Sequence, residues 1–365
     1  MKVREVISAL ERFAPLPLQD GFDNAGLQVG LTEDAEVTRA LLCLDVTEAI
    51  VDEALATGCN LIVSHHPLLF KGCKTITGKD YVERCVMKAI AGGVAIYAAH
   101  TNLDNVSGGV NYKMAEKIGL VDVKPLDPRQ ESLLKLVTYV PTSQADDLRS
   151  ALFAAGCGHI GAYDGCSWNV EGQGTFRALE GTHPYCGRVG EKHVESEVRI
   201  ETILPAYLRG RVVKALLEAH PYEEPAYDLY ALKNTWTGAG SGAVGELQTP
   251  ETETEFLKRI KKTFEVACVR HTRLTGRLIR RVALCGGAGS FLIPTALAAG
   301  ADVFITGEMR YHEFFGREQD ILLAELGHYE TEQYTKDLLF EILTHECPGL
   351  DLQMTKLNTN PIKYM

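Results

Sequence analysis

Short apolar runs alternate with segments of helical spacing at both ends of the chain. In the first third, the runs RALLCLD, NLIVS and VAIYAA are separated by VTEAIVDEALATG and YVERCVMKAIAGG, whose apolar residues recur at helical intervals and whose ends are glycines. The last third repeats this order with RVALC, SFLIPTALAAG, DVFIT and ILLAEL, followed by a helix expected over about 329–343. Strands that alternate with helices indicate a parallel α/β sheet, in which ligands bind beyond the carboxyl ends of the strands.

The two ends of the chain also match each other. Residues 37–66 align without a gap onto residues 279–308, and a second block aligns His100-x-x-x-Asp104 with His328-x-x-x-Glu332. Seven positions of the first block are identical: Arg39/Arg281, Leu42/Leu284, Cys43/Cys285, Ala54/Ala296, Leu55/Leu297, Ala56/Ala298 and Gly58/Gly300. The match predicts an internal duplication whose halves pack about a pseudo-two-fold axis, although shared βαβ composition could also produce it.

The middle of the chain has a different order of elements. From about residue 133 to residue 232, the pattern is strand–helix–strand followed by strand–helix–strand, which is the ferredoxin-like order. We therefore expect an inserted α+β domain over 129–234. The flanking segments 1–128 and 235–365 would together form one α/β domain from two similar halves.

Composition and charge narrow the class of protein. Lys and Arg number 37 against 48 Asp and Glu, and the net charge of −11 disfavours duplex nucleic acid as a partner. The N-terminus lacks the uninterrupted apolar stretch of a signal peptide, and no membrane span is apparent, so a cytoplasmic location is expected. The ten cysteines are dispersed without a C-x-x-C pair, which favours small buried side chains over a disulfide framework.

Five residues at predicted strand ends suggest a metal site. His65 and His66 follow NLIVS, and adjacent side chains of an extended segment point in opposite directions, which suits two neighbouring ions better than one. His328 and Glu332 would share one helix face, and Asp104 adds a second carboxylate. Imidazoles with carboxylates suit two divalent ions such as Zn, Fe, Mn, Co or Ni. Alternatively, these rings and carboxylates could simply form hydrogen bonds at helix starts.

Other polar residues near these strand ends are candidates for supporting roles. His100, His312 and Glu308 could orient ligands, and His100 or His312 could act as a general acid or base. Ordinary surface or capping roles explain them equally well. The glycine-rich CGGAGS (285–290) could cradle a phosphate at a helix N-terminus, but without the full phosphate-loop pattern a tight turn explains it more simply.

Six motifs, in order along the chain, resemble those of a known family. They are GFDNAGLQVG, SHHPLLF, AHTNLDNVSGGVN, TGEMRYHE, GHYETE and NTNP, which run from residue 21 to residue 361. The set resembles the NGG-interacting-factor-three-like family, whose members are named GTP cyclohydrolase I type 2 homologues. The middle, with GTFRALEGTHPYCGRVG and AHPYEEPAYDLY, resembles the extra domain of the longer YqfO-like members, which is similar to CutA and PII.

The resemblance implies a dinuclear site carried by His65, His66, Asp104, His328 and Glu332, in a toroidal homohexamer built as a trimer of dimers. Glu308 stands where the family often has Asp. Two functions follow as hypotheses. The first is a metal-dependent hydrolase acting on a nucleotide or phosphoester. The alternative is a non-enzymatic metal-handling or regulatory ring whose inserted domain senses a small-molecule or nucleotide ligand. The chain lacks the cysteine/histidine zinc pattern expected of the classical cyclohydrolase, so the family name does not by itself assign a reaction.

Overall fold

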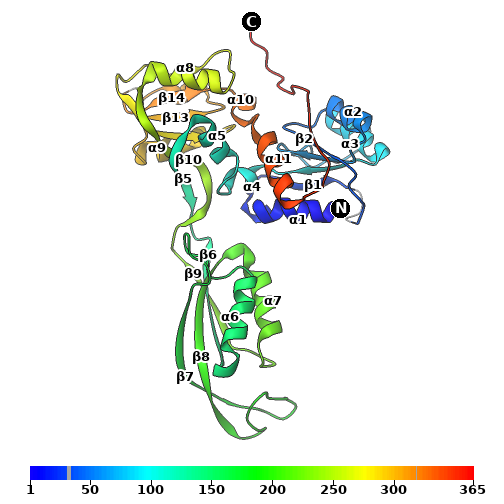
Figure 1. Cartoon of the computed structure of the whole chain (residues 1–365), viewed down its shortest axis with the longest axis vertical. Helices are drawn as coiled ribbons and strands as arrows, with labels where there is room; N and C mark the ends of the chain where they lie inside the picture. The colour runs from blue at the N-terminus through cyan, green and yellow to red at the C-terminus, as the bar shows by residue number, and fades with distance from the viewer. Residues whose placement is uncertain (31–33, 318) are drawn as a thin grey trace. The chain divides into compact units, whose positions relative to one another are not determined.

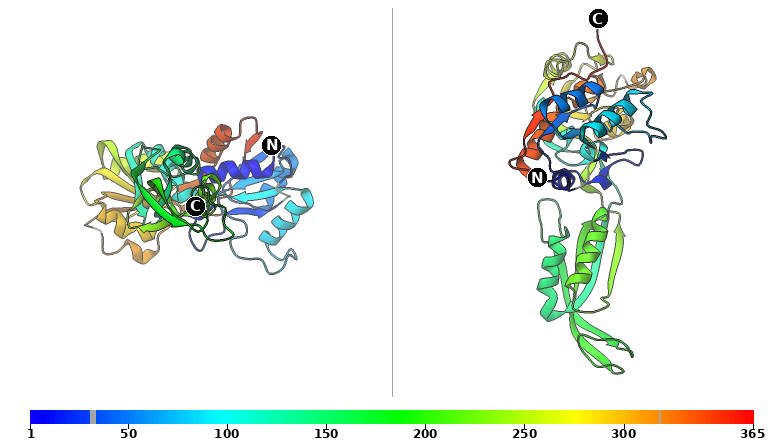
Figure 2. Two further views of the ribbon diagram at one scale, coloured as in Figure 1. Left: turned by 90° about the horizontal axis from the view of Figure 1, so that it is seen from below. Right: turned by 90° about the vertical axis from the view of Figure 1, so that its right-hand side faces the viewer.

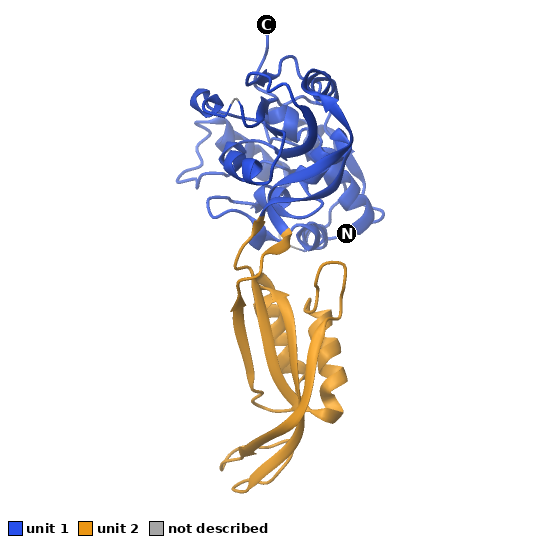
Figure 3. Ribbon diagram, turned by 90° about the vertical axis from the view of Figure 1, so that its left-hand side faces the viewer, with its two compact units in different colours: residues 1–127, 239–365 blue, residues 128–238 orange. Residues whose placement is uncertain are grey.

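The computed structural model describes residues 1–30, 34–317 and 319–365 of the chain. The chain divides into two compact units, one made of residues 1–127 with 239–365 and the other of residues 128–238 (Figure 3). Strands β5 (Leu120–Arg129) and β10 (Trp236–Thr252) carry the chain between the two units. None of the described helices is long and apolar enough to cross a membrane.

The first unit contains two sheets, of which one comes mainly from the N-terminal segment. This five-stranded sheet has the order β1-β4-β3-β2-β15, and its three central strands are parallel. Its strands are β1 (Gly26–Val29), β2 (Ala40–Cys43), β3 (Leu61–Ser64), β4 (Ala95–Ala98) and β15 (Leu352–Met354). Every residue of β2, β3 and β4 is buried, which explains why these segments are continuous apolar runs.

The helices of this first half are α1 (Val3–Phe13), α2 (Glu48–Thr57), α3 (Tyr81–Gly92), α4 (Thr101–Asn105) and α5 (Val110–Ile118). Helices α2 and α3 begin at side chains that accept a hydrogen bond from the first turn, Thr47 and Asp80. Both end at glycines in the left-handed conformation, Gly58 and Gly93, as the sequence pattern predicts.

The second sheet of this unit has six strands in the order β11-β14-β13-β12-β10-β5. Its remaining strands are β11 (Arg270–His271), β12 (Leu278–Cys285), β13 (Val303–Thr306) and β14 (Leu322–Glu325). In parallel pairing, Val282 lies beside Val303 in this sheet, and Ala40 lies beside Leu61 in the first sheet. The same number of residues separates the two partners in both pairs. The run β12-β13-β14 therefore has the order and register of β2-β3-β4, so equivalent strand ends are available in both halves. Figures 1 and 2 show the first sheet mainly in blue and the second mainly in yellow to orange.

The C-terminal half carries α8 (Glu253–Thr263), α9 (Ile293–Ala298), α10 (His328–Glu332) and α11 (Thr335–Glu346). The single helix that we expected over 329–343 is wrong. The chain interrupts it at residues 333–334, and the short α10 is a separate element that begins directly after β14 and Gly327. The interruption matters because α10 alone supplies His328 and Glu332.

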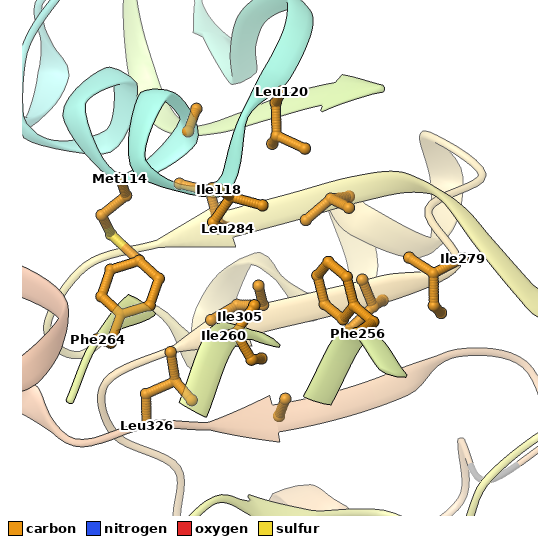
Figure 4. Packing of buried hydrophobic residues seen from close by; sticks show 14 of the residues in the cluster. Met114, Ile118, Leu120, Phe256, Ile260, Phe264, Ile279, Leu284, Ile305 and Leu326 are labelled. Atoms are coloured by element: carbon orange, nitrogen blue, oxygen red, sulfur yellow. The ribbon is translucent and has the colours of Figure 1, made fainter. Parts of the chain in front are cut away.

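A buried cluster holds α5 and α8 against the second sheet (Figure 4). Met114 and Ile118 of α5 and Phe256 and Ile260 of α8 lie in one core with Leu284 of β12. Phe256 is fully buried, and removing a side chain of this size from water stabilises the fold by roughly 1.5–3 kcal/mol. A helix from the first half of the sequence thus packs in the core of the second.

The second unit has the element order strand–helix–strand–strand–helix–strand. Its elements are β6 (Leu133–Pro141), α6 (Ala145–Ala154), β7 (Ser167–Arg177), β8 (Lys192–Pro205), α7 (Arg209–Ala219) and β9 (Tyr227–Leu232). The sheet order is β7-β8-β6-β9, with antiparallel pairing throughout. Val198, Ile200 and Leu204 of β8 pack in one core with apolar residues of α6 and α7, so the alternate residues of β8 lie on the opposite face of the sheet.

Candidate metal centre

Two adjacent histidines follow strand β3 at its carboxyl end. His65 is fully buried and His66 is partly exposed. Our expectation that their rings point in opposite directions is wrong, because the chain bends at both residues instead of continuing as a pleated strand. The ring centroids lie 4.9 Å apart, and the Nε2 atoms of both histidines lie within 4 Å of the carboxylate of Glu332.

Helix α10 supplies the other side of the cluster. His328 and Glu332 are four residues apart and share one helix face. The Glu332 Oε2 atom lies 2.9 Å from His66 Nε2 and 3.1 Å from His328 Nε2. Its Oε1 atom lies 3.8 Å from His65 Nε2. One carboxylate therefore meets three imidazoles, and its two oxygens face different rings.

Each of the three imidazoles is held by a hydrogen bond at its other nitrogen. His65 Nδ1 lies 2.8 Å from the carbonyl oxygen of Ala99. His66 Nδ1 lies 2.7 Å from Asp45 Oδ1, and His328 Nδ1 lies 2.8 Å from Glu308 Oε1. All three partners are acceptors, so each Nδ1 donates and each Nε2 presents a lone pair to the cluster when the ring is neutral. This is the arrangement that metal-binding histidines require.

One nitrogen of the cluster is buried without a hydrogen-bond partner among the residues that the structure describes. His65 Nε2 is shielded from solvent, and its nearest carboxylate oxygens are Asp104 Oδ1 at 3.6 Å and Glu332 Oε1 at 3.8 Å. An unpaired buried polar atom costs roughly 1–3 kcal/mol. A cation between this nitrogen and the two carboxylates would relieve that cost. His65, His66 and Glu332 could hold a metal ion, because their ligand atoms lie within 4.8 Å of one another.

The charged groups of the cluster shift one another's pKa values. Burial alone would lower the pKa of the His66 imidazole, but the Asp45 and Glu332 carboxylates outweigh it and raise this pKa to about 10. Burial likewise opposes the charge of Glu332, yet the hydrogen bonds from His328 and His66 hold its pKa well below the usual range. Burial raises the pKa of Asp104, and the nearby Glu332 carboxylate raises it further. Two carboxylates that repel each other in a buried site favour a cation between them.

The glycine-rich turn after β12 packs against the cluster. Gly287 has a φ of +58°, and a Cβ atom there would lie 2.3 Å from Glu332 Oε1. The amide groups of this turn already donate to side chains: Gly286 to Asn111, Gly287 to Thr331 and Gly289 to Thr306. The turn therefore packs tightly against α10. A phosphate bound by CGGAGS would need backbone N–H donors, and those of Gly286, Gly287 and Gly289 are already used.

His100 and His312 occupy different places. The His100 ring lies 5.4 Å from that of His65 and 5.6 Å from that of His66, at the edge of the cluster. His312 is exposed on the turn η5 (Tyr311–Phe314), and among the described residues its ring contacts are with Tyr311 and Phe315. The structure therefore brings His100, but not His312, to the cluster.

A carboxylate that the sequence pattern did not single out anchors His100. Asp23 Oδ1 lies 2.7 Å from His100 Nδ1, and Asp23 Oδ2 accepts from both the backbone and the hydroxyl of Thr101. Burial opposes the charge of Asp23, but these bonds prevail and lower its pKa to about 2. Asp23 lies in the motif GFDNAGLQVG, yet neither its spacing nor its neighbours assigned it a role.

We expect the acid stability of the protein to depend on Asp23. Its folded-state pKa lies below the ordinary value of 3.8, so its contribution is present above that pH and is lost as the pH falls toward about 2. Asp23→Asn should lower the free energy of unfolding by roughly 1–2 kcal/mol at pH 7, and the difference from wild type should shrink below pH 4. Denaturant unfolding at both pH values measures it. Asp34→Asn, at an exposed carboxylate, is the control and should change little, and an equal loss in both variants would contradict the prediction.

The comparisons with known proteins agree on one family. Residues 1–361 match the model of the family described as Duf34/NIF3 (NGG1p interacting factor 3). A protein of Halalkalibacterium halodurans named "GTP cyclohydrolase 1 type 2 homolog" is 40% identical over 365 residues, covering 99% of this chain and 98% of the relative. A protein of the same name from Bacillus subtilis is 35% identical over 368 residues, covering 99% and 98% of the two chains.

Solved structures give the same result. The crystal structure of a Bacillus cereus protein related to NIF3 superposes with a TM-score of 0.87 at 37% identity, covering 100% of this chain and 99% of that one. Staphylococcus aureus protein SA1388 superposes with a TM-score of 0.78 at 30% identity, with the same coverage. The mixed α/β architecture with several sheets is therefore shared along the full chain. The resemblance drawn from the six sequence motifs is confirmed, and the chain belongs to the Duf34/NIF3 (NGG1p interacting factor 3) family.

Proposed function

We propose that the cluster is a dinuclear metal centre held by His65, His66, Asp104, His328 and Glu332. The observation that carries the proposal is the position of the Glu332 carboxylate, whose Oε1 faces His65 and whose Oε2 faces His66 and His328. A carboxylate that presents separate oxygens to separate imidazoles is suited to bridge two ions. Asp104 lies beside His65 and would complete that half of the centre.

The reaction class that suits this centre is hydrolysis of a nucleotide or phosphoester. A pair of divalent ions supplies Lewis acidity toward a phosphoryl or ring-carbon centre and lowers the pKa of a water molecule. The chain's own contribution would be orientation, through Asp45 and Glu308 at the outer nitrogens, and proton movement at His100. His100 is hydrogen-bonded to the buried carboxylate of Asp23, as a proton-transferring imidazole should be. Within residues 1–30, 34–317 and 319–365, no carboxylate anchors the exposed His312 in this way.

The test is metal content and turnover in matched variants. His65→Ala should lower the tightly bound metal from two equivalents to one or fewer, measured by elemental analysis after loading with Mn²⁺, which disfavours thiolate ligands, and desalting. The same variant should lose at least a hundredfold in turnover of whichever nucleotide or phosphodiester the loaded wild type hydrolyses. His345→Ala, at an exposed histidine on α11, is the control and should change neither quantity.

Two outcomes would contradict the proposal. A wild-type protein that retains no metal after loading would refute the centre itself. A loaded protein that leaves a broad panel of nucleotides and phosphodiesters intact would refute the hydrolase while leaving the centre in place.

A second function, ligand sensing, is suggested by the second unit. Its strand order matches the ferredoxin-like arrangement, and we propose that it corresponds to the PII/CutA-like domain expected at 129–234. A cleft of about 740 Å³ lies on this unit, with Phe176, Tyr185 and Tyr222 beside Glu197 and Arg199. Such a mixture of aromatic and charged side chains suits a small molecule. In this reading the chain would be a regulatory, metal-handling subunit of a homohexamer.

A variant in which a short linker replaces residues 130–234 separates the two functions. If the second unit senses a ligand, this variant keeps the metal of the Glu332 cluster but loses any effect of nucleotides on thermal stability. Identical nucleotide responses in the variant and the full chain would rule out sensing by this unit. Sedimentation of the full chain tests the hexamer.

A further inference from the structure

A second group of metal-ligating side chains lies in the second unit, on the long hairpin formed by β7 and β8. Cys186, His193 and Glu195 each offer one ligand atom, and these atoms lie within 4.8 Å of one another. Cys186 comes from loop 178–191 between the two strands, while the other two residues are on β8. All three are partly exposed, so an ion from solution can reach them.

Strand geometry brings the three side chains together. His193 and Glu195 are two apart on β8 and therefore point to the same face, opposite the one that packs in the helical core. The residue that pairs with Glu195 on β7 is Gly174, which has no side chain to fill this face. Gly187 has a φ of +80°, and a Cβ atom there would lie 2.9 Å from His193 Cβ. The glycine after Cys186 thus allows the loop to approach His193 closely.

The contacts converge on the Glu195 carboxylate. His193 Nε2 lies 2.8 Å from Glu195 Oε2, and the Cys186 Sγ atom lies within 4.8 Å of a Glu195 carboxylate oxygen. Three ligand atoms within 4.8 Å of one another are the pattern of a shared cation site. Burial and the Glu195 carboxylate raise the pKa of the Cys186 thiol, which also disfavours a free reactive thiolate.

We propose that Cys186, His193 and Glu195 form a zinc-class metal site, separate from the cluster around Glu332. One thiolate, one imidazole and one carboxylate are a ligand set that Zn²⁺ accepts with tetrahedral geometry and a fourth position open to water or another ligand. Ligand atoms at the corners of such a site are about 3.3–3.7 Å apart, given bonds of about 2.0–2.3 Å, so side-chain adjustment of about 1 Å closes the site. Binding releases the thiol proton to solvent, so affinity rises with pH.

Neighbouring side chains support the three ligands. Tyr222 OH accepts a weak hydrogen bond from the Cys186 thiol at 3.8 Å and donates to Glu197 Oε1 at 2.7 Å. Phe176 lies against the His193 ring, with centroids 5.3 Å apart, and also against Tyr222. These contacts limit the rotation of the thiol and the imidazole, so less ordering is required when an ion binds.

Cobalt binding to the full-length protein tests the site, because only a thiolate ligand gives an intense sulfur-to-cobalt absorption in the near ultraviolet. We expect this absorption in reduced wild type to reach the intensity of one thiolate-bound Co²⁺ per chain, after up to three equivalents because the proposed dinuclear centre also takes up Co²⁺, and Zn²⁺ should abolish it. The same absorption should appear in Glu332→Gln, which shows that it does not come from the other cluster. Cys186→Ser should abolish it, and His193→Ala should weaken Co²⁺ binding more than tenfold.

Cys166→Ser is the matched control, since Cys166 is a partly buried cysteine of the same unit that bonds to the carbonyl of Asp164. It should retain the absorption in full. Thermal unfolding of Cys186→Ser verifies that the variant is folded. The proposal is overturned if wild type shows no such absorption, or if the absorption survives Cys186→Ser. Rapid alkylation of Cys186 at neutral pH that Zn²⁺ does not slow would also overturn it, and would indicate a nucleophile instead.

Discussion

Glu332→Gln should empty the metal cluster of the first unit. An amide at this position keeps the shape of the side chain but removes the negative charge that faces His65, His66 and His328. The substitution also replaces one carboxylate oxygen with an NH2 group, whose N–H bonds point at the imidazole nitrogens. We expect affinity for Zn²⁺ or Mn²⁺ to fall more than a hundredfold, beyond the tenfold to hundredfold typical of residues that only support ligands. Isothermal titration of metal-free protein measures this loss.

Glu330→Gln is the matched control for that prediction. Glu330 is buried on the same helix α10, but its carboxylate accepts from Asn360 Nδ2 at 2.9 Å and is not directed at the histidines. The same chemical change two residues away should therefore leave metal affinity within a few-fold of wild type. Equal losses in the two variants would show that α10, and not the Glu332 carboxylate, determines binding, and would remove the basis for a bridging ligand.

Gly287→Ala should abolish metal binding through shape alone. The new methyl group would lie 2.3 Å from Glu332 Oε1 and 3.2 Å from His328 Nε2, so the carboxylate must move away from the imidazoles. The residue also has a φ of +58°, which costs a non-glycine residue about 1–2 kcal/mol. We expect a lower melting temperature together with loss of the tightly bound metal, measured by elemental analysis after loading.

Gly58→Ala is the control for Gly287→Ala, because it introduces the same backbone strain without a clash with Glu332. Gly58 has a φ of +73° at the end of α2, and an added Cβ atom meets no heavy atom within 4 Å. This variant should be destabilised by a similar 1–2 kcal/mol but should keep its metal. If Gly287→Ala also retained full metal content, the position of the Glu332 carboxylate would be less critical than the geometry suggests.

The sequence pattern predicted that the cluster would form from strand ends of the two matching halves. Strands β3 and β14 belong to different sheets, so the edge rule for one parallel sheet does not by itself bring His66 and Glu332 together across 266 residues. The direction of the two adjacent rings could not be predicted. Pleat alternation applies only while the strand continues, and a bend at His65 and His66 depends on hydrogen bonds that the sequence does not display. The assignment of all five residues as ligands remains a prediction.

Residues that hold the ligands were harder to identify. Asp45 follows β2 just as His66 follows β3, so the rule about carboxyl ends of parallel strands could have identified it. Asp23 lies in an irregular segment, where no periodicity indicates its direction. The break between α10 and α11 also lacked a signal, since neither glycine nor proline interrupts the chain there.

The cysteines show the limit of reasoning from composition. Cys43 and Cys285 lie in buried strands, as the pattern predicted, but Cys186 is only partly buried. Its relation to His193 and Glu195 depends on a loop that returns to the strand following it, and no short-range spacing encodes that contact.

The hydrogen bond from His65 to the backbone carbonyl of Ala99 affects what a mutagenesis screen can detect. The rings of His66 and His328 are oriented by side chains, so a saturation mutagenesis screen for metal-dependent function should identify Asp45 and Glu308 as sensitive positions. Any amino acid at position 99 still provides a carbonyl oxygen. Tolerance at position 99 would therefore reflect only the space available to a side chain, and the anchor of the most deeply buried histidine would leave no trace in the mutational map.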